Sequence, residues 1–352
     1  QHFDIMLFGA AASVFFALVA QIGEQVDYLR FMPQKTTSNK KRWWFWLMLA
    51  GPGWIMIGLI KMLLGSFLAY LAITQGLAPS VASDPSQMYF KIFSYLSNTP
   101  TLPLLLAAMM VIISQLKINV TNAYAGSIAW SNFFSRLTHS HPGRVVWLIF
   151  NVIIALLLME LGIYQVLESI LGLFAIVAVS WLGSVSADLL INRPLGLRPR
   201  EVEFKRAHLY DINPVGCGSM VLASIIGLLC YLGLFGLVLQ NLGHFISLLC
   251  CFIFVPLIAW LTKGRFYIAR HSPQLIPLLD RAKAAQTLDI STASPIVSLH
   301  CGVCENDFEA DDMSYCPAYA LPICSLCCTL EVRCLDSCKP KARVSQQIVD
   351  LL

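Results

Sequence analysis

The sequence predicts an all-α polytopic membrane protein with seven transmembrane helices, followed by a small cysteine-rich metal-binding module. Of its 352 residues, 57% are hydrophobic and only 12% are charged, whereas a soluble domain carries about 25% charged residues. The apolar residues are gathered in runs long enough to cross a bilayer, so the lipid bilayer is the first expected partner. The C-terminal region breaks this pattern, because eight of the twelve cysteines lie between Cys301 and Cys338.

Seven segments are predicted to span the membrane, because each contains about 20 mainly apolar residues. The second and third are longer than a bilayer requires, so we expect each to tilt or to kink. The fourth and fifth are joined by so short a connection that they should form a tight hairpin. The spans are residues 3–27, 44–76, 102–136, 145–162, 166–191, 215–239 and 243–262.

The placement of positive charge predicts the orientation. Fifteen Lys and Arg residues lie on the side that holds the loops after the first, third, fifth and seventh spans, whereas the opposite side holds only Lys91. Cytosolic loops carry the excess of Lys and Arg, so the first residue is expected outside and everything after Leu261 in the cytosol. The basic residues form no continuous basic face, which argues against nucleic acid as a partner.

Four regions lie outside or beyond the spans of the transmembrane region 1–270. Residues 84–96 are expected to form a short helix on the outer face, either as a lid over a cavity or as an interfacial helix. Residues 271–298 should form a cytosolic helix and a linker, residues 299–340 the cysteine-rich module, and residues 341–352 the start of a further helix. Because the chain starts without Met and ends as a helix begins, we expect an internal piece of a longer protein.

The third span carries a polar stripe. At about 100° per residue, Gln115, Asn119, Asn122 and Gly126 fall within about 60° of one another on one helix face. Amides offer both donors and acceptors, which suits a ligand with fixed polar groups. The alternative is that these amides hydrogen-bond to neighbouring helices and hold the bundle together.

The first span also ends in polar residues at membrane depth, namely Gln21 and Glu24, with Gly23 between them. A glycine among polar residues inside a span is typical of a membrane helix that breaks and lines a cavity. An ordinary polar helix end is the alternative.

Two motifs resemble the nucleobase–cation symporter family, which includes the purine and cytosine permeases. They are IGEQVDYLRFMP (22–33) and, two spans later, INVTNAYAGSIAWSNFFSRL (118–137). The resemblance covers residues 3–270 and implies that the seven spans correspond to the last seven of a twelve-span, five-plus-five inverted-repeat transporter fold.

The resemblance also implies a nucleobase-like ligand near the bilayer midplane. Gln21, Gly23 and Glu24 would line it from the broken span, and the stripe with Asn119 and Asn122 from the later one. Thr121 lies where the family places hydroxyls that bind sodium. Lys117 nearby could replace that cation or repel it, so coupling to sodium and coupling to protons both stay open.

Ordinary members of that family end soon after their last span. A permease-like region with a cysteine-rich tail resembles the membrane input half of bacterial hybrid sensor histidine kinases. This implies a place in the bacterial inner (plasma) membrane, no enzymatic activity in residues 1–352 themselves, and a kinase domain after Leu352 in the full-length protein. The alternatives are a plain cation-coupled nucleobase transporter with an accessory metal-binding tail, and a structural anchor without a ligand.

The cysteines of the tail follow the spacing C-x2-C-x11-C-x7-C-x2-C-C-x5-C-x3-C. A cytosolic module keeps its thiols reduced, so disulfides are not expected. The pairs Cys301/Cys304 and Cys324/Cys327 have the chelate spacing of tetrahedral zinc. Two zinc ions would use all eight thiolates, the second ion taking Cys316, Cys328, Cys334 and Cys338.

Two alternatives concern the ligands of this module. An iron–sulfur cluster uses the same four-thiolate ligation, and His300 could replace one cysteine. A module of about 40 residues cannot bury enough core to fold alone, so metal would supply folding free energy. Because no ligand position is obviously left open for water, a structural or sensing role is favoured over hydrolysis.

Overall fold

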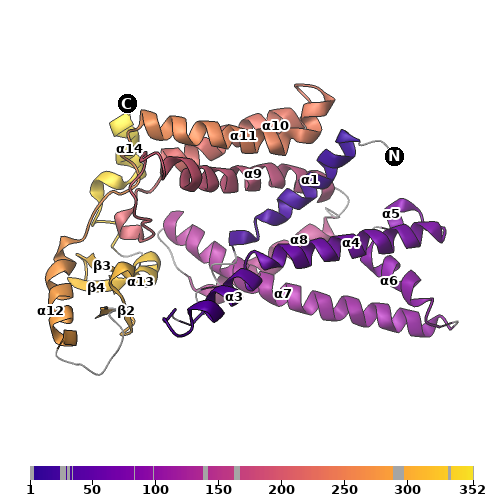
Figure 1. Cartoon of the computed structure of the whole chain (residues 1–352), viewed down its shortest axis with the longest axis horizontal. Coiled ribbons are helices and arrows are strands. Elements are labelled where there is room, and N and C mark those ends of the chain that lie inside the picture. The colour runs from indigo at the N-terminus through magenta and orange to yellow at the C-terminus, as the bar shows by residue number, and fades with distance from the viewer. Residues whose placement is uncertain are drawn as a thin grey trace. The chain divides into compact units, whose positions relative to one another are not determined.

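The computed structural model is mostly helical (Figure 1). It divides into two compact units, which are residues 1–21, 129–147 and 153–352 for the larger and residues 22–128 and 148–152 for the smaller. Each unit is described by itself. The structure describes residues 4–23, 29, 32–33, 35–82, 84–97, 99–137, 142–161, 167–287, 297–331 and 334–351.

Five helices among the described residues are long and apolar enough to cross a membrane, which indicates a multi-pass membrane protein. The first of them is interrupted at Gly51–Pro52, between α3 (Lys40–Ala50) and α4 (Gly53–Thr74). Proline lacks the amide N–H that a helix interior needs, and its ring clashes with the preceding turn. This break is the kink expected in the second predicted span. The five helices cover residues 40–74, 101–135, 170–192, 214–231 and 237–261.

Two of the seven predicted spans correspond to shorter helices. Helix α1 (Ile5–Val19) has 15 residues, about 22 Å at 1.5 Å per residue, which is less than the hydrocarbon thickness of about 30 Å. Helix α8 (Arg144–Glu160) has 17 residues, the lower limit for a span. The expected hairpin connection 162–166 lies outside the described residues. Helix α7 (Thr101–Leu137), by contrast, is a single helix of 37 residues, so it has no break of the kind seen in the second span.

Two shorter helices outside the spans agree with the sequence. Asp84 caps helix α6 (Pro85–Phe93), because its Oδ1 accepts hydrogen bonds from the backbone N–H of Ser86 at 2.9 Å and from its hydroxyl at 2.7 Å. Helix α12 (Ile276–Thr287) occupies the region predicted as a cytosolic helix. Both helices therefore follow from local sequence signals, a capping residue with proline in the first turn in one case and helix-favouring residues in the other.

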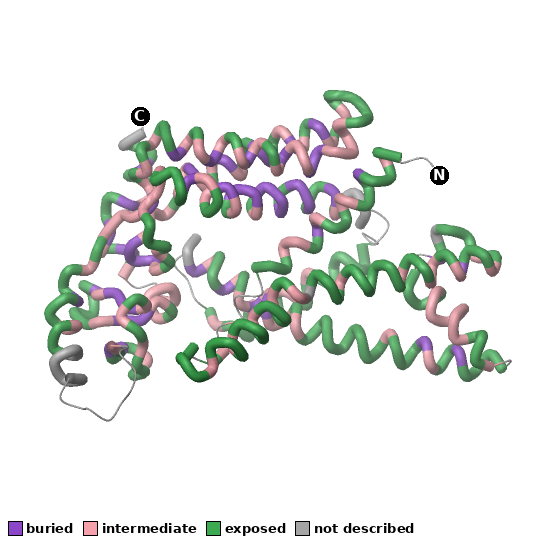
Figure 2. The backbone as a smooth tube through the Cα atoms, in the orientation of Figure 1, coloured by how far each residue is buried: buried purple, intermediate pink, exposed green. Residues whose placement is uncertain are grey.

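The larger unit contains a helical bundle. Helix α1 packs on α9 and α11, and α9, α10 and α11 pack on one another. Buried residues follow α9 in particular (Figure 2). The bundle elements after α1 are α9 (Leu167–Ala187), the π-helix η2 (Asp188–Asn192), the π-helix η4 (Pro214–Gly218), α10 (Ser219–Tyr231) and α11 (Leu237–Leu261).

Small and hydroxylated residues form the seam between these helices. The hydroxyls of Ser180 on α9 and Ser247 on α11 are hydrogen bonded to each other, and Ser247 also donates to the Ala223 carbonyl at 3.1 Å. Lipid tails are as apolar as leucine, so helices in a bilayer associate by close packing and by such hydrogen bonds. Gly227 on α10 allows one of the close approaches, because a Cβ there would lie 2.7 Å from Cγ2 of Ile176.

Gly227→Ala is therefore expected to destabilise the bundle by about 1–3 kcal/mol, the usual cost of overpacking. The added methyl would also lie 2.9 Å from Cβ of Ser247, so α11 or Ile176 has to move. The measurement is the midpoint of thermal unfolding of the detergent-purified chain. Gly65→Ala is the matched control, because a Cβ at that helical position meets nothing within 4 Å. Equal midpoints for the two variants would show that the seam does not have this packing.

The C-terminal module contains two small antiparallel sheets and a short helix, α13 (Ser325–Leu330). Its core consists of Leu299, Met313, Ile323 and buried cysteines, and Leu275, from the region predicted as a cytosolic helix and linker, belongs to the same core. The module therefore contains strands as well as helix, and the sequence did not reveal them because they are too short to show an alternating pattern. They are β1 (Ser298–His300) paired with β2 (Asp307–Glu309), and β3 (Met313–Cys316) paired with β4 (Leu321–Cys324).

Candidate metal centre

Four cysteines converge at one point of the module. The Sγ atoms of Cys301, Cys304, Cys324 and Cys327 all lie within 4.8 Å of one another. In a tetrahedral site with Zn–S bonds of about 2.3 Å, neighbouring sulfurs are about 3.8 Å apart. The separation of 4.0 Å between the sulfurs of Cys304 and Cys324 is close to that value. These four residues could therefore hold one metal ion such as zinc.

Two local structures position the four sulfurs. The first is the turn after β1, which carries Cys301 and Cys304 and is held to β4 by a hydrogen bond from the Gly302 N–H to the Pro322 carbonyl at 2.9 Å. A side chain at Gly302 would collide with Leu321, since its Cβ would lie 2.8 Å from a leucine methyl. The second is the start of α13, where Cys324 is the N-cap and Cys327 lies in the first turn.

Backbone amides point at the sulfurs. The N–H of Cys324 donates to Sγ of Cys301 at 3.3 Å, and the N–H of Cys327 donates to Sγ of Cys324 at 3.4 Å. Burial alone would raise the pKa of Cys301, but the N–H groups of Cys304, Cys324 and Val303 outweigh it and lower that pKa to about 6. A thiolate therefore forms readily at Cys301.

The neighbouring cysteines behave in the opposite way. Burial and the adjacent Cys301 thiolate raise the pKa of Cys324 to about 11, and they raise that of Cys327 as well. Several negative charges this close repel one another, and a divalent cation between them would remove that cost. The donor set fits zinc, and it also fits the four-thiolate ligation of an iron–sulfur cluster.

The other four cysteines lie elsewhere in the module. They line one small cavity of about 10 Å³, together with Ala207 from the loop between α9 and α10. Among the described residues the close cluster of sulfurs is found for the first predicted set, and a metal site at the second set stays a prediction. The second set is Cys316, Cys328, Cys334 and Cys338.

His300 does not belong to either group. Its side chain is 61% exposed, and its Nδ1 lies 3.1 Å from Oδ1 of Asp307 on the neighbouring strand. The expectation that His300 could replace a cysteine ligand is therefore wrong for this arrangement. The reason is the strand geometry, since consecutive residues of a strand point to opposite faces and Leu299, not His300, faces the core.

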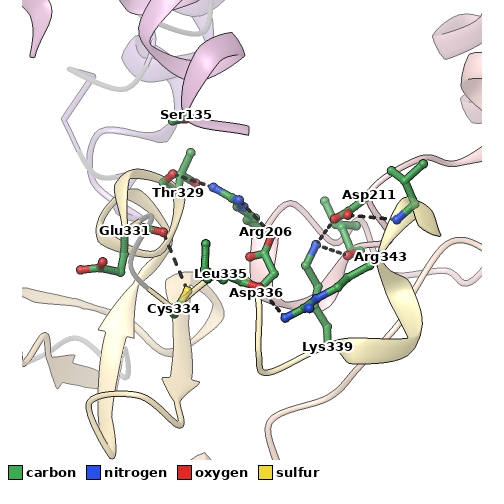
Figure 3. A network of polar contacts seen from close by, with 12 residues as sticks. Ser135, Arg206, Asp211, Thr329, Glu331, Cys334, Leu335, Asp336, Lys339 and Arg343 are labelled. Atoms are coloured by element: carbon green, nitrogen blue, oxygen red, sulfur yellow. Dashed lines mark hydrogen bonds and ion pairs between the residues drawn. The ribbon is translucent and has the colours of Figure 1, made fainter. Parts of the chain in front are cut away.

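The module is docked on the loop between α9 and α10 by two ion pairs (Figure 3). Arg206 of the loop lies 2.9 Å from Asp336 of the module, and the two side chains are only 5% and 9% exposed. Arg206 also donates to the Thr329 carbonyl at 3.1 Å. Lys339 of the module reaches back to Asp211 of the loop at 2.8 Å. The lysines and arginines of this loop served in the sequence only to predict the orientation in the membrane, and their ion pairs with the module were not predicted.

The same loop holds helix α14 (Val344–Leu351). Oδ2 of Asp211 accepts a hydrogen bond from the N–H of Val344 at 3.3 Å, so Asp211 reaches the first residue of α14. Gln347 exchanges two hydrogen bonds with the backbone of Ile212, at 3.2 and 2.8 Å. The loop is therefore bonded both to the cysteine module and to the helix that follows it.

The loop is also fixed at its membrane end. Arg198 pairs with Asp188 of η2 at 2.5 Å, and the hydroxyl of Tyr267, a residue that follows α11, donates to the same carboxylate. Asn192 adds a hydrogen bond to Asp188 at 3.0 Å. Polar contacts thus fix the loop both to the end of α9 and to the module.

The predicted ligand residues on α7 lie on its exposed surface. Gln115, Asn119 and Asn122 are all exposed, and the hydroxyl of Thr121 donates to the Lys117 carbonyl of its own helix. Gly126 packs against a residue that was not predicted, because a Cβ there would lie 2.6 Å from Nδ2 of Asn151 on α8. The stripe therefore exists as a helix face, and its role as a ligand site stays a prediction.

The polar end of the first span gives a similar result. Gln21 and Gly23 are exposed just after α1, whereas Glu24 lies outside the described residues. Gln21 belongs to the larger unit and Gln115, Asn119 and Asn122 to the smaller. That these residues share one ligand site stays a prediction.

His244 on α11 is a buried polar residue that the sequence analysis did not single out. It is 1% exposed, its ring stacks on Phe16 with centroids 6.1 Å apart, and Tyr231 lies edge-on at 6.4 Å. An ionisable residue inside a span is a functional candidate by default, and that rule applied to every span would have found it. The residues that pack on it are aromatic, so the structure assigns it no chemical role.

No protein-family model, curated protein or solved structure matches the chain. The functional conclusion therefore depends on the residues themselves, on the four-cysteine centre and on the contacts that join it to the membrane helices.

Proposed function

We propose that the chain is the membrane input region of a sensor, which recognises a nucleobase-like small molecule and transmits that event through its metal-bound module to a domain after α14. The observation that carries this proposal is the docking of the module. A tail that served only to store metal would not need a buried ion pair with a loop between membrane helices, Arg206–Asp336, and a second pair that holds a buried lysine, Asp211–Lys339.

The path of the signal follows the same contacts. A ligand that shifts α9 or α10 would move the loop between them, because Asp188 and Arg198 fix the loop to the end of α9. The loop would carry the module and α14 with it, since Asp211 bonds to both Lys339 and Val344. A metal-stiffened module transmits such a movement, whereas a flexible tail would absorb it.

The ligand class rests on the amides of α7 and on the family resemblance of residues 3–270. Asn119 and Asn122 are exposed on one face of a membrane-spanning helix. Polar side chains inside a span are costly, and hydrogen bonds from these amides to the fixed donors and acceptors of a planar base would offset that cost. The excess of Lys and Arg on one side supports a cytosolic position of the module.

Asn119→Ala and Asn122→Ala are each expected to weaken the binding of radiolabelled purines or cytosine to the complete membrane region by about 5- to 150-fold. The reason is that a polar group of the bound base left without its partner costs about 1–3 kcal/mol. Asn132→Ala is the matched control, because Asn132 is exposed on the same helix but lies outside the stripe.

Three outcomes separate the possible roles. Binding without uptake supports the sensor, whereas uptake that is independent of the module supports a plain cation-coupled transporter with an accessory tail. No binding of any nucleobase, with both asparagine variants indistinguishable from the parent, would overturn the ligand assignment and leave a structural anchor.

A further inference from the structure

The second set of cysteines surrounds a single small space. Cys316 ends β3, Cys328 lies in α13, and Cys334 and Cys338 lie in the turns before α14, so the four thiols arrive from separate segments. All four line the cavity of about 10 Å³, which is near the smallest volume that holds one water-sized particle. A space of this size bounded by four thiols suits one ion better than an organic ligand.

The backbone between two of these cysteines is held in an unusual conformation. Leu335 and Asp336 have φ angles of 46° and 52°, in the left-handed region that a bulky residue such as leucine rarely adopts. Such strain persists only where surrounding interactions impose the conformation. Here the turn lies between Cys334 and Cys338, and both cysteines line the cavity. In the first centre, Glu305, which directly follows Cys304, also has a positive φ of 58°.

The cavity lies where the module meets the membrane-proximal loop. Ala207 of that loop is part of its wall, and the preceding residue is Arg206, whose guanidinium pairs with Asp336. Four thiolates around a divalent ion carry a net negative charge, and an adjacent buried arginine offsets it. The loop therefore supplies both part of the wall and the balancing cation.

We propose that Cys316, Cys328, Cys334 and Cys338 bind a second zinc ion as four thiolates, and that this ion fixes the docked position of the module on the loop. Each thiol releases its proton to solvent when the ion binds. The two centres then have separate tasks. The first ion holds the module folded, and the second holds Cys334–Cys338 beside Arg206 so that the module stays attached. The zinc assignment stands apart from the proposed ligand recognition.

The test is the zinc content of the full chain, purified in detergent under reducing conditions and loaded with Zn²⁺. Two ions per chain are expected for the parent, and one for Cys334→Ser/Cys338→Ser, with faster amide hydrogen exchange in residues 206–213. Cys217→Ser/Cys250→Ser should retain two ions, because these cysteines belong to membrane helices. One ion in the parent, or two in Cys334→Ser/Cys338→Ser, would overturn the proposal.

A second measurement uses the parent alone and so does not depend on the folding of a variant. With Co²⁺ in place of zinc, the intensity of the sulfur-to-cobalt charge-transfer absorption reports the number of bound thiolates. An intensity for eight thiolates is expected, and one for four would contradict the second site. Iron with acid-labile sulfide in the purified chain would contradict the assignment to zinc. Loss of nucleobase binding would change neither result.

Discussion

Replacing Cys301 and Cys324 together by serine is expected to unfold the C-terminal module. The two residues come from different knuckles of the first centre, so the double variant leaves that centre only two of its four cysteines. Structural zinc contributes about 10–16 kcal/mol to such small modules, which exceeds the total stability of about 5–15 kcal/mol of an ordinary domain. The strands here have only three or four residues, so little else supports them.

Amide hydrogen exchange of residues 297–342 in the full chain measures this effect, with full loss of protection expected in the variant. A strong zinc chelator should produce the same loss in the parent. Cys217→Ser, an exposed cysteine next to α10, is the matched control and should leave the protection unchanged. A module that stays protected in both the variant and the chelated parent would show that metal does not support its fold.

Arg206→Met is expected to release the folded module from the loop. It leaves the Asp336 carboxylate buried without its partner, which costs about 3–5 kcal/mol, and it removes the hydrogen bond to the Thr329 carbonyl. Exchange should therefore become faster in residues 206–213 and 336–344, while the first metal centre keeps its zinc. In a protein that includes a downstream domain, ligand binding should persist and the response to ligand should be lost.

Two further variants make the result specific. Arg206→Met/Asp336→Leu should recover part of the docking, because it removes the uncompensated charge and leaves an apolar pair in its place. Arg200→Met is the control, since Arg200 is exposed in the same loop. Slow exchange retained in Arg206→Met would show that the ion pair does not hold the module.

Local sequence signals predicted the elements that depend on local interactions. Asp84 with a proline in the first turn specified α6, and the excess length of the second span predicted a tilt or a kink, which the structure shows as a break at Gly51–Pro52. Helix α1 ends at Val19, inside the predicted first span, and residues 24–27 of that span lie outside the described residues. The small strands were missed, since their pairing depends on contacts across the module.

The candidate site likewise has a part that local sequence predicts and a part that only the tertiary structure reveals. The two C-x2-C spacings were sufficient to pair Cys301 and Cys304 with Cys324 and Cys327, because chelate geometry is a property of short loops. No local pattern marks Arg206 as the partner of Asp336, 130 residues away. Nor does any mark Asp211 as the partner of Lys339, 128 residues away. Hydropathy gave no reason to single out Asn151, which packs against Gly126.

The sequence by itself determined that the chain has helices apolar enough to cross a membrane and two cysteine pairs spaced to bind one metal ion, because bilayer thickness and chelate geometry both act over short stretches of chain. Only the tertiary structure decided that the other four cysteines line one cavity and which loop the module binds. Those choices depend on where distant segments come to lie, and buried charges such as Arg206 and Lys339 are stable only where folding brings an opposite charge to them.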